Sequence, residues 1–269
     1  MLAEFIVLFR ESLEVSFVVG IILAYLHRTG NEDQEKHIWL GVSVGILLSI
    51  ALAGILLILK ADFESNEPLF EGFFMVVTAG LVTWLLMWMA KQRNVADRLR
   101  GDTQAAIAKG GMHGVFFLAL VATLREGVEA LLFMAGIFAS TGALSLLGAF
   151  IGIAAAVAVG FLVFEYAVKF NIGLFFRVTA IVLVLLAAGL FSQGVHELQE
   201  AKVLPVWVEH VYDINPALNQ DGSYPALHDH GAVGSVLRGL VGYDGAPSDL
   251  QVLGYLGYLG AVYLLYRAA

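Results

Sequence analysis

Long apolar segments alternate with short polar connections along the whole chain. An α-helix rises about 1.5 Å per residue, so roughly 20 apolar residues cross the hydrocarbon core of a bilayer, which is about 30 Å thick. Seven segments reach or approach this length, and we expect each to form a membrane-spanning helix. They cover approximately residues 2–26, 38–59, 69–90, 112–138, 143–168, 172–200 and 249–266.

The basic residues of the connections predict how these helices are oriented. Lysine and arginine are concentrated after the first, third and fifth segments and at the C-terminus. Connections rich in these residues stay on the cytoplasmic side of a membrane. We therefore expect the N-terminus outside the cell, the C-terminus in the cytoplasm, and the polar stretch of residues 201–248 as an external loop.

The composition strengthens the prediction of a membrane protein. Hydrophobic residues make up 59% of the 269 residues and charged residues 14%, and the mean hydropathy is +0.81. These values are too apolar for a soluble domain of this length, so we expect an all-α integral membrane protein with one membrane domain spanning residues 1–269. The formal net charge of −8 argues against nucleic acid as a partner.

Two of the predicted helices carry charges where a lipid-spanning helix should be apolar. The first and the fourth both contain the pattern Arg-Glu-x-x-Glu, at residues 10–14 and 125–129. A charge at mid-membrane costs about 2.5 to 3.5 kcal/mol or more, so we expect a function to keep it there. In a helix the two glutamates of each motif share one face, and the arginine reaches the second glutamate one turn later.

The repetition of the motif predicts an inverted repeat. Residues 1–91 and residues 112–200 each contain three predicted helices and begin with the motif helix. Because the number of helices per repeat is odd, the two repeats insert in opposite directions, as in many secondary transporters with a substrate site near the midplane. We therefore expect seven transmembrane helices, arranged as two inverted three-helix repeats plus a C-terminal helix, with the motifs meeting at similar depth.

Together the two motifs predict a site for a multivalent cation. Four glutamates and two arginines leave a formal charge of −2. The chain has no cysteine, so oxygen or imidazole must hold the metal, which suits iron, magnesium, calcium or manganese rather than copper(I). The arginines would keep the carboxylates ionised and oriented. The candidate ligands are Glu11, Glu14, Glu126 and Glu129, and the motif arginines are Arg10 and Arg125.

An alternative is that each motif is a buried salt bridge that binds no ligand. Two arginines cannot neutralise four glutamates, however, and the surplus negative charge requires another partner. We therefore favour a metal site over a purely structural role.

The paired motifs resemble those of the oxidase-dependent iron transporter family, the fungal high-affinity iron permeases and the bacterial EfeU-type permeases. The resemblance includes Leu-Phe-Glu-Gly at residues 69–72 and Gly-Val-His-Glu-Leu-Gln-Glu at residues 194–200. It implies that the motif glutamates bind iron and that an extracytoplasmic oxidase or peroxidase is a partner. We therefore predict a multi-pass iron permease of the inner or plasma membrane that moves ferric iron, or iron oxidised at the outer face, inward. Iron is then cargo, and neither a permanently bound cofactor nor enzymatic activity is expected.

Polar residues at the external helix ends are candidates for an outer access site. Together with the acidic connector of residues 62–67 they would form a vestibule that concentrates cations. Ordinary solvated helix ends are the alternative. The candidates are Glu71, His196, Glu197 and Glu200, and weaker candidate ligands in the external loop are His228, Asp229 and His230.

Two other functions compete with iron transport. One is transport of another divalent metal, such as manganese or lead, through the same motifs. The other is a metal-dependent membrane enzyme using His196, Glu197 and Glu200, which resemble an incomplete His-Glu-x-x-His zinc motif.

Overall fold

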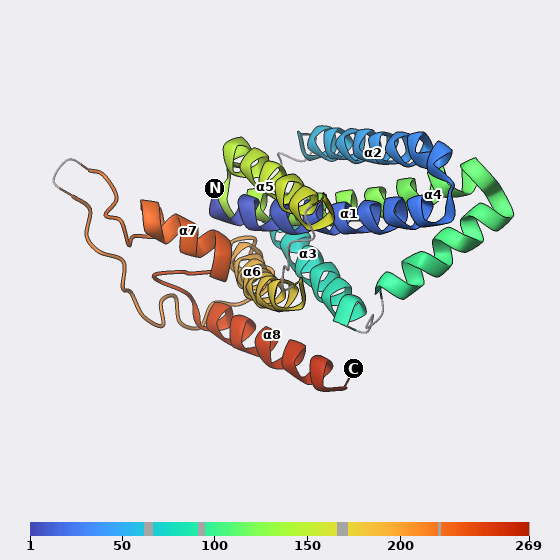
Figure 1. Cartoon of the computed structure of the whole chain (residues 1–269). Helices are drawn as coiled ribbons and strands as arrows, with labels where there is room; N and C mark the ends of the chain where they lie inside the picture. Colours follow the sequence, from blue (N-terminus) through green and yellow to red (C-terminus); the bar gives the residue numbers. More distant parts are fainter. Residues whose placement is uncertain (62–66, 91–94, 166–171, 220–221, 269) are drawn as a thin grey trace.

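The computed structural model describes residues 1–61, 67–90, 95–165, 172–219 and 222–268 (Figure 1). Across these ranges the chain forms eight α-helices and one short 3-10 helix and contains no strand, which confirms the predicted all-α class. The elements are α1 (Leu2–Thr29), η1 (Glu32–Gln34), α2 (Glu35–Ala61), α3 (Glu67–Ala90), α4 (Val95–Thr141), α5 (Leu146–Glu165), α6 (Ile172–Glu200), α7 (Ala232–Val241) and α8 (Asp249–Ala268).

Four segments within the described residues are long and apolar enough to cross a membrane, judged by length and composition. Helix α1 and the second part of α4 are also long, but they contain the charged motifs. The expected total of seven spans therefore stays a prediction. The four segments are Glu32–Ile55, Pro68–Met87, Leu146–Phe164 and Arg177–Glu200.

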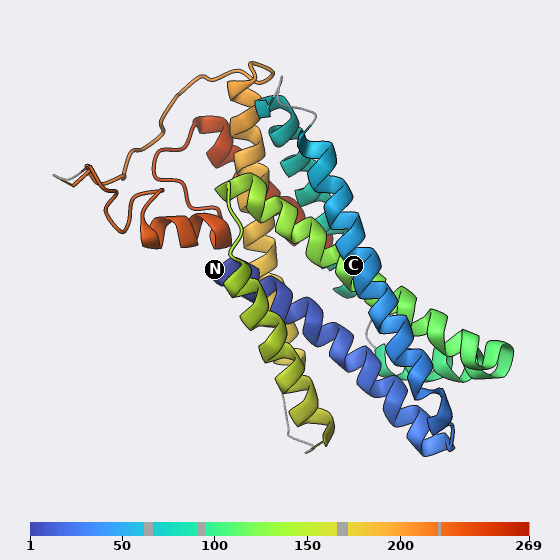
Figure 2. The ribbon, with the colours of Figure 1, turned by 90° about the horizontal axis from the view of Figure 1, so that it is seen from above.

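The first three long helices pack mainly against the next three. Helix α1 packs along α5, α2 packs along α4, and α3 packs along α6. Helix α1 also contacts α4, while α8 lies against α6 (Figures 1 and 2). The two motif helices are thereby held side by side, with α5 and α2 as their outer neighbours.

Glycine allows the motif helices to approach these neighbours closely. A Cβ atom added to Gly41 of α2 would lie 2.5 Å from the carbonyl oxygen of Phe116 in α4. A Cβ atom added to Gly152 of α5 would lie 2.7 Å from the carbonyl oxygen of Phe5 in α1. Real side chains do not tolerate such distances, so glycine fixes how near the backbones come.

Helix α4 bends sharply at Gly111. This glycine has φ 52° and ψ −130°, which is outside the helical region and is readily adopted only by glycine. The bend folds residues 95–110 back as a helical arm (Figure 1), where the sequence predicted only a basic loop. An added Cβ on Gly114 would overlap the carbonyl oxygen of Ala106, so the two arms touch directly.

The stretch of residues 201–248, expected to be an external loop, contains a helix that packs among the others. Helix α7 contacts α6, α4 and α1. It ends at Gly242, which has φ 70° and lies directly against Gly189, about three turns before the end of α6. The hydroxyl of Tyr255 in α8 donates to the carbonyl of Val241 over 2.8 Å. This stretch therefore reaches into the helical bundle.

Candidate metal site

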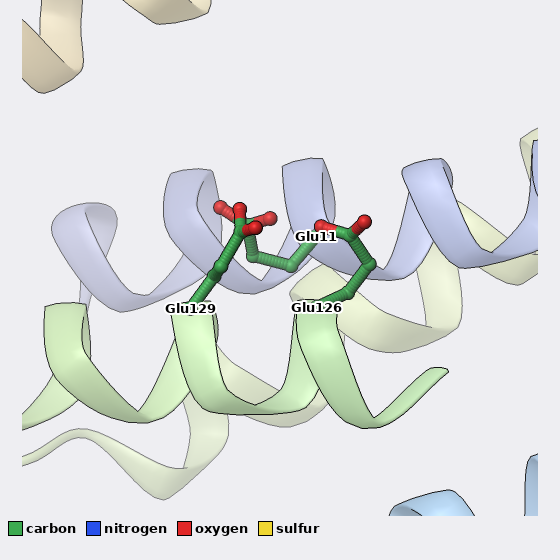
Figure 3. Close-up of side chains that lie close together, drawn as sticks. All are labelled: Glu11, Glu126 and Glu129. Atoms are coloured by element: carbon green, nitrogen blue, oxygen red, sulfur yellow. The ribbon is translucent and has the colours of Figure 1, made fainter. Parts of the chain in front are cut away.

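The two Arg-Glu-x-x-Glu motifs face each other where α1 contacts α4. Figure 3 shows Glu11 of α1 pointing toward Glu126 and Glu129 of α4. One oxygen from each of these carboxylates lies within 4.8 Å of the other two, and all three residues are buried. We refer to Glu11, Glu126 and Glu129 as the carboxylate cluster.

Each arginine bridges the two glutamates of its own motif. On α1, Arg10 Nη1 lies 2.6 Å from Glu11 Oε1, and Arg10 Nη2 lies 2.8 Å from Glu14 Oε1. On α4, Arg125 Nη2 lies 2.5 Å from Glu126 Oε1, and its Nε lies 3.2 Å from Glu129 Oε1. The helical spacing of the motif produces this arrangement, because residues one turn apart share a face.

The second oxygen of each cluster carboxylate is left for another partner. Glu11 Oε2, Glu126 Oε2 and Glu129 Oε2 are buried and accept no hydrogen bond from the described part of the chain. A buried carboxylate oxygen without a partner is costly, and a hard cation is a suitable partner for several such oxygens at once. The cluster thus has the donor set of a cation site.

Three of the four predicted ligands meet in this cluster. Glu14 is also buried, at 8% exposure, but its carboxylate is not among the oxygens that lie within 4.8 Å of one another. It is held by Arg10, which also holds Glu11. Across the described ranges, no other group of three or more ligand side chains is gathered in this way.

Apolar side chains close the cluster on both sides along the motif helices. One buried group lies toward the start of α1 and the end of α4, and another lies toward the end of α1 and the bend of α4. The first includes Val7, Phe133, Ile137, Leu186 and Leu190, and the second includes Val19, Ile22, Ile38, Val115 and Ala119. Buried apolar side chains therefore lie on both sides of the cluster along the motif helices.

The two motif arginines differ in their surroundings. The side chain of Arg10 is 2% exposed, whereas that of Arg125 is 38% exposed. Arg125 and Glu129 line a groove of about 430 Å³ between α3 and α4, which we call the α3–α4 groove. The remaining lining is apolar or aromatic and consists of Leu81, Val82, Trp84, Leu85, Val121, Leu124, Val128, Leu132 and Phe133.

The predicted outer access residues lie where α3 and α6 meet. His196 Nε2 is 3.3 Å from Glu200 Oε1, and both side chains are well exposed. A Cβ added to Gly72 would lie 3.0 Å from Glu197 Cβ, so Glu71 and Glu197 belong to neighbouring turns of the two helices. Most of the acidic connector, residues 62–66, lies outside the described residues.

The weak loop candidates make contacts that help to fold the stretch of residues 201–248. The Asp229 carboxylate accepts from Asn215 Nδ2 and from the backbone nitrogen of Gly245, each over 2.7 Å. The rings of His228 and His230 both pack against Tyr224. These contacts tie distant parts of the loop together.

Sequence reasoning did not identify Glu4 as a buried charged residue of the bundle. Its Oε1 accepts from the backbone nitrogen of Ser145 over 2.9 Å, which joins the start of α1 to the start of α5. The available signal was a glutamate in an apolar segment, two turns before Glu11 on the same helix face.

Comparison with known proteins gives a consistent result over nearly the whole chain. The model of the iron permease FTR1 family matches residues 1–267. A ferrous iron permease EfeU from Escherichia coli O6:K15:H31 is 31% identical over 264 residues, which cover 96% of this chain and 92% of that protein. A ferrous iron permease EfeU from Yersinia pestis is 29% identical over 271 residues, covering 99% of this chain and 93% of that protein. No solved structure matches the chain.

Proposed function

The chain belongs to the iron permease FTR1 family, and we propose that it moves iron across a membrane through the carboxylate cluster. Its apolar helices and its permease relatives make it a multi-pass membrane protein. The observation that carries the proposed site is the meeting of Glu11, Glu126 and Glu129, each buried and each with at least one oxygen that accepts no hydrogen bond from the described residues. Glu14, the fourth predicted ligand, is assigned a supporting role beside Arg10.

We propose that α1 to α6 and α8 are the seven membrane spans and that α1–α3 and α4–α6 are inverted repeats. The helix pairing supports this, because exchanging the two sets of three helices converts the α1–α5 contact into the α4–α2 contact. Both contacts are extensive, and the α1–α4 and α3–α6 contacts map onto themselves. This is the relation expected of a two-fold repeat with its site at the interface.

The proposed orientation has the N-terminus outside, with iron moving inward. The N-terminus and the stretch of residues 201–248 lie toward one end of the bundle, whereas the bend of α4 lies toward the other (Figure 1). The segment before that bend is rich in arginine and lysine, which favours a cytoplasmic location. The oxidase or peroxidase partner implied by the family resemblance would then act near Glu71, His196, Glu197 and Glu200.

The charge of the site favours a divalent ion. Four glutamates and two arginines leave a formal charge of −2, and a net charge is costly at membrane depth. Fe(II) neutralises this charge, and the relatives are named ferrous iron permeases. Ferric iron, expected from the wider family resemblance, is the alternative. Uptake of Fe(II) kept reduced by ascorbate, compared with uptake of an Fe(III) chelate, separates the two forms.

Iron uptake into proteoliposomes tests the proposed site. We expect Glu126→Gln and Glu129→Gln each to lower the uptake rate by roughly tenfold or more, because each removes a charged ligand. Glu209→Gln, in an exposed part of the external stretch, is the matched control and should transport normally.

Normal uptake by both motif variants would contradict the proposal. Loss of uptake in His196→Ala alone would indicate that the outer residues, and not the carboxylate cluster, are the functional site. The alternative membrane enzyme would use the same outer residues. Stronger uptake of manganese or lead than of iron would leave the site in place and change its cargo.

A further inference from the structure

We propose that Arg125 is an exchangeable cation of the transport site: it releases Glu126 and Glu129 when iron binds and moves into the α3–α4 groove, while Arg10 stays in place. This inference rests on the proposed function of the carboxylate cluster. It adds a residue that sets how tightly iron is held and how readily it leaves.

The first observation is the difference between two arginines at equivalent positions of the repeated motif. Both guanidinium groups contact two glutamates of their own helix. The Arg10 side chain is enclosed, at 2% exposure, and does not line the α3–α4 groove. The Arg125 side chain is 38% exposed and lines the α3–α4 groove. Arg125 is therefore the arginine that can change position without repacking the bundle.

The second observation is the number of oxygens that the site offers. With both arginines in place, four carboxylate oxygens of the cluster accept no hydrogen bond from the described residues: one of Glu11, one of Glu126 and both of Glu129. Hard cations of this class take about six oxygen ligands. The Arg125 guanidinium covers Glu126 Oε1 and Glu129 Oε1. Its departure therefore frees Glu126 Oε1 from a hydrogen bond and removes the positive charge beside Glu129 Oε1, so that both oxygens can reach the metal.

The third observation is that the groove provides a destination for the side chain. Its volume of about 430 Å³ far exceeds the roughly 30 Å³ that one water molecule occupies in the liquid. Long side chains in a helix tend to point back toward its N-terminus, so an Arg125 side chain released from Glu129 would turn toward Val121, which also lines the groove. Trp84 of α3 lines this groove, and its indole ring is the best aromatic partner for a guanidinium.

Arg125 then competes with the transported ion for the same carboxylates. Iron binding displaces the arginine, and the return of the arginine to Glu126 and Glu129 displaces iron. Removing this positive charge should therefore strengthen iron binding and slow iron release. Removing Arg10 should instead disorder Glu11 and weaken binding.

Binding and transport measurements on the same variants test this exchange. We expect Arg125→Gln to bind Fe(II) at least tenfold more tightly than the native protein in anaerobic detergent solution, and to transport it more slowly in proteoliposomes. Arg125→Lys should restore both values toward native, and Arg10→Gln should bind Fe(II) more weakly. A variant that was merely damaged would not gain affinity. Weaker or unchanged binding by Arg125→Gln would overturn the proposal.

A labelling experiment examines the native arginine directly. The chain contains no cysteine, so Leu81→Cys introduces one thiol into the α3–α4 groove. We expect Fe(II) to reduce the reaction rate of this thiol with a cationic reagent at least threefold, because Arg125 then occupies the groove. Leu218→Cys, in the exposed stretch before α7, is the control and should not respond. An unchanged rate at position 81 would count against movement of Arg125.

The glutamate variants separate failure of the exchange from failure of the site itself. If Glu126→Gln and Glu129→Gln still bind Fe(II) normally, both the proposed function of the cluster and the exchange of Arg125 with iron are wrong. If these variants lose binding while Arg125→Gln behaves like Arg10→Gln, the site stands and only the exchange falls.

Discussion

At the scale of single residues, the site combines side chains whose roles differ despite identical motifs. Arg10 and Arg125 each hold one oxygen of a glutamate in the carboxylate cluster, which leaves the second oxygen of that glutamate for a ligand. The sequence predicted these charged residues as the candidate ligands, because charges in a lipid-spanning helix are so costly. It could not predict that Glu14 lies outside the cluster or that Arg125 lines a groove. Both depend on how α1, α3 and α4 pack together.

The position of Glu14 leads to a prediction about ligand strength. We expect Glu11→Gln to weaken Fe(II) binding by about tenfold or more, which corresponds to roughly 1.4 kcal/mol. Glu14→Gln should weaken it only about two- to threefold, because Arg10 remains held by Glu11. Titration of the purified variants with Fe(II) under anaerobic conditions measures the difference. Equal losses would make Glu14 a direct ligand.

At the scale of elements, the apolar segments predicted the long helices well, and two departures have physical reasons. Residues 95–110 are polar and contain glycine, so they lack the apolar pattern of a membrane span, although they form a helix that packs on the second part of α4. Helix α7 has only ten residues and is flanked by irregular chain. Both elements are stabilised by tertiary contacts, which a single sequence does not encode locally.

The bend of α4 gives a stability prediction for Gly111. An alanine at φ 52° and ψ −130° is strained, so Gly111→Ala should lower the free energy of unfolding by about 1–3 kcal/mol. The cause is the backbone alone, since an added Cβ would contact nothing within 4 Å. Gly257→Ala in α8 is the matched control, because its Cβ also meets nothing and its backbone is helical. It should be neutral or slightly stabilising in denaturant unfolding in detergent.

If Gly111→Ala and Gly257→Ala unfolded at the same denaturant concentration as each other, we would conclude that the bend at Gly111 does not impose a conformational constraint. A loss in both of them would instead point to a general effect of the substitution on helix packing.

At the scale of the whole molecule, the sequence predicted one bundle in which the motifs of two repeats meet. The contact between α1 and α4 and the gathering of Glu11, Glu126 and Glu129 agree with that expectation. The number of spans and the orientation stay predictions, since only four segments of the described residues are apolar enough to be identified by composition. Helices α1 and α4 do not meet such a criterion, because they contain the charged motifs.

The orientation can be measured with single cysteines in this cysteine-free chain. We expect Leu218→Cys, in the stretch before α7, to react with a membrane-impermeant thiol reagent on intact cells. Asp33→Cys, in the connection between α1 and α2, should react only after the cells are opened. Both positions are exposed, so access depends on the side of the membrane rather than on burial. The reverse pattern would invert the proposed topology and the direction of transport.

The carboxylate cluster is shared between α1 and α4, so its affinity for a cation depends on how these two helices are placed. Its three oxygens lie within 4.8 Å of one another, while one turn of a helix measures about 5.4 Å. If one helix slid past the other by a single turn, Glu11 would leave Glu126 and Glu129, and a bound cation would lose its ligand from α1. In such a bundle, sliding of one half past the other would therefore weaken the hold on the ion.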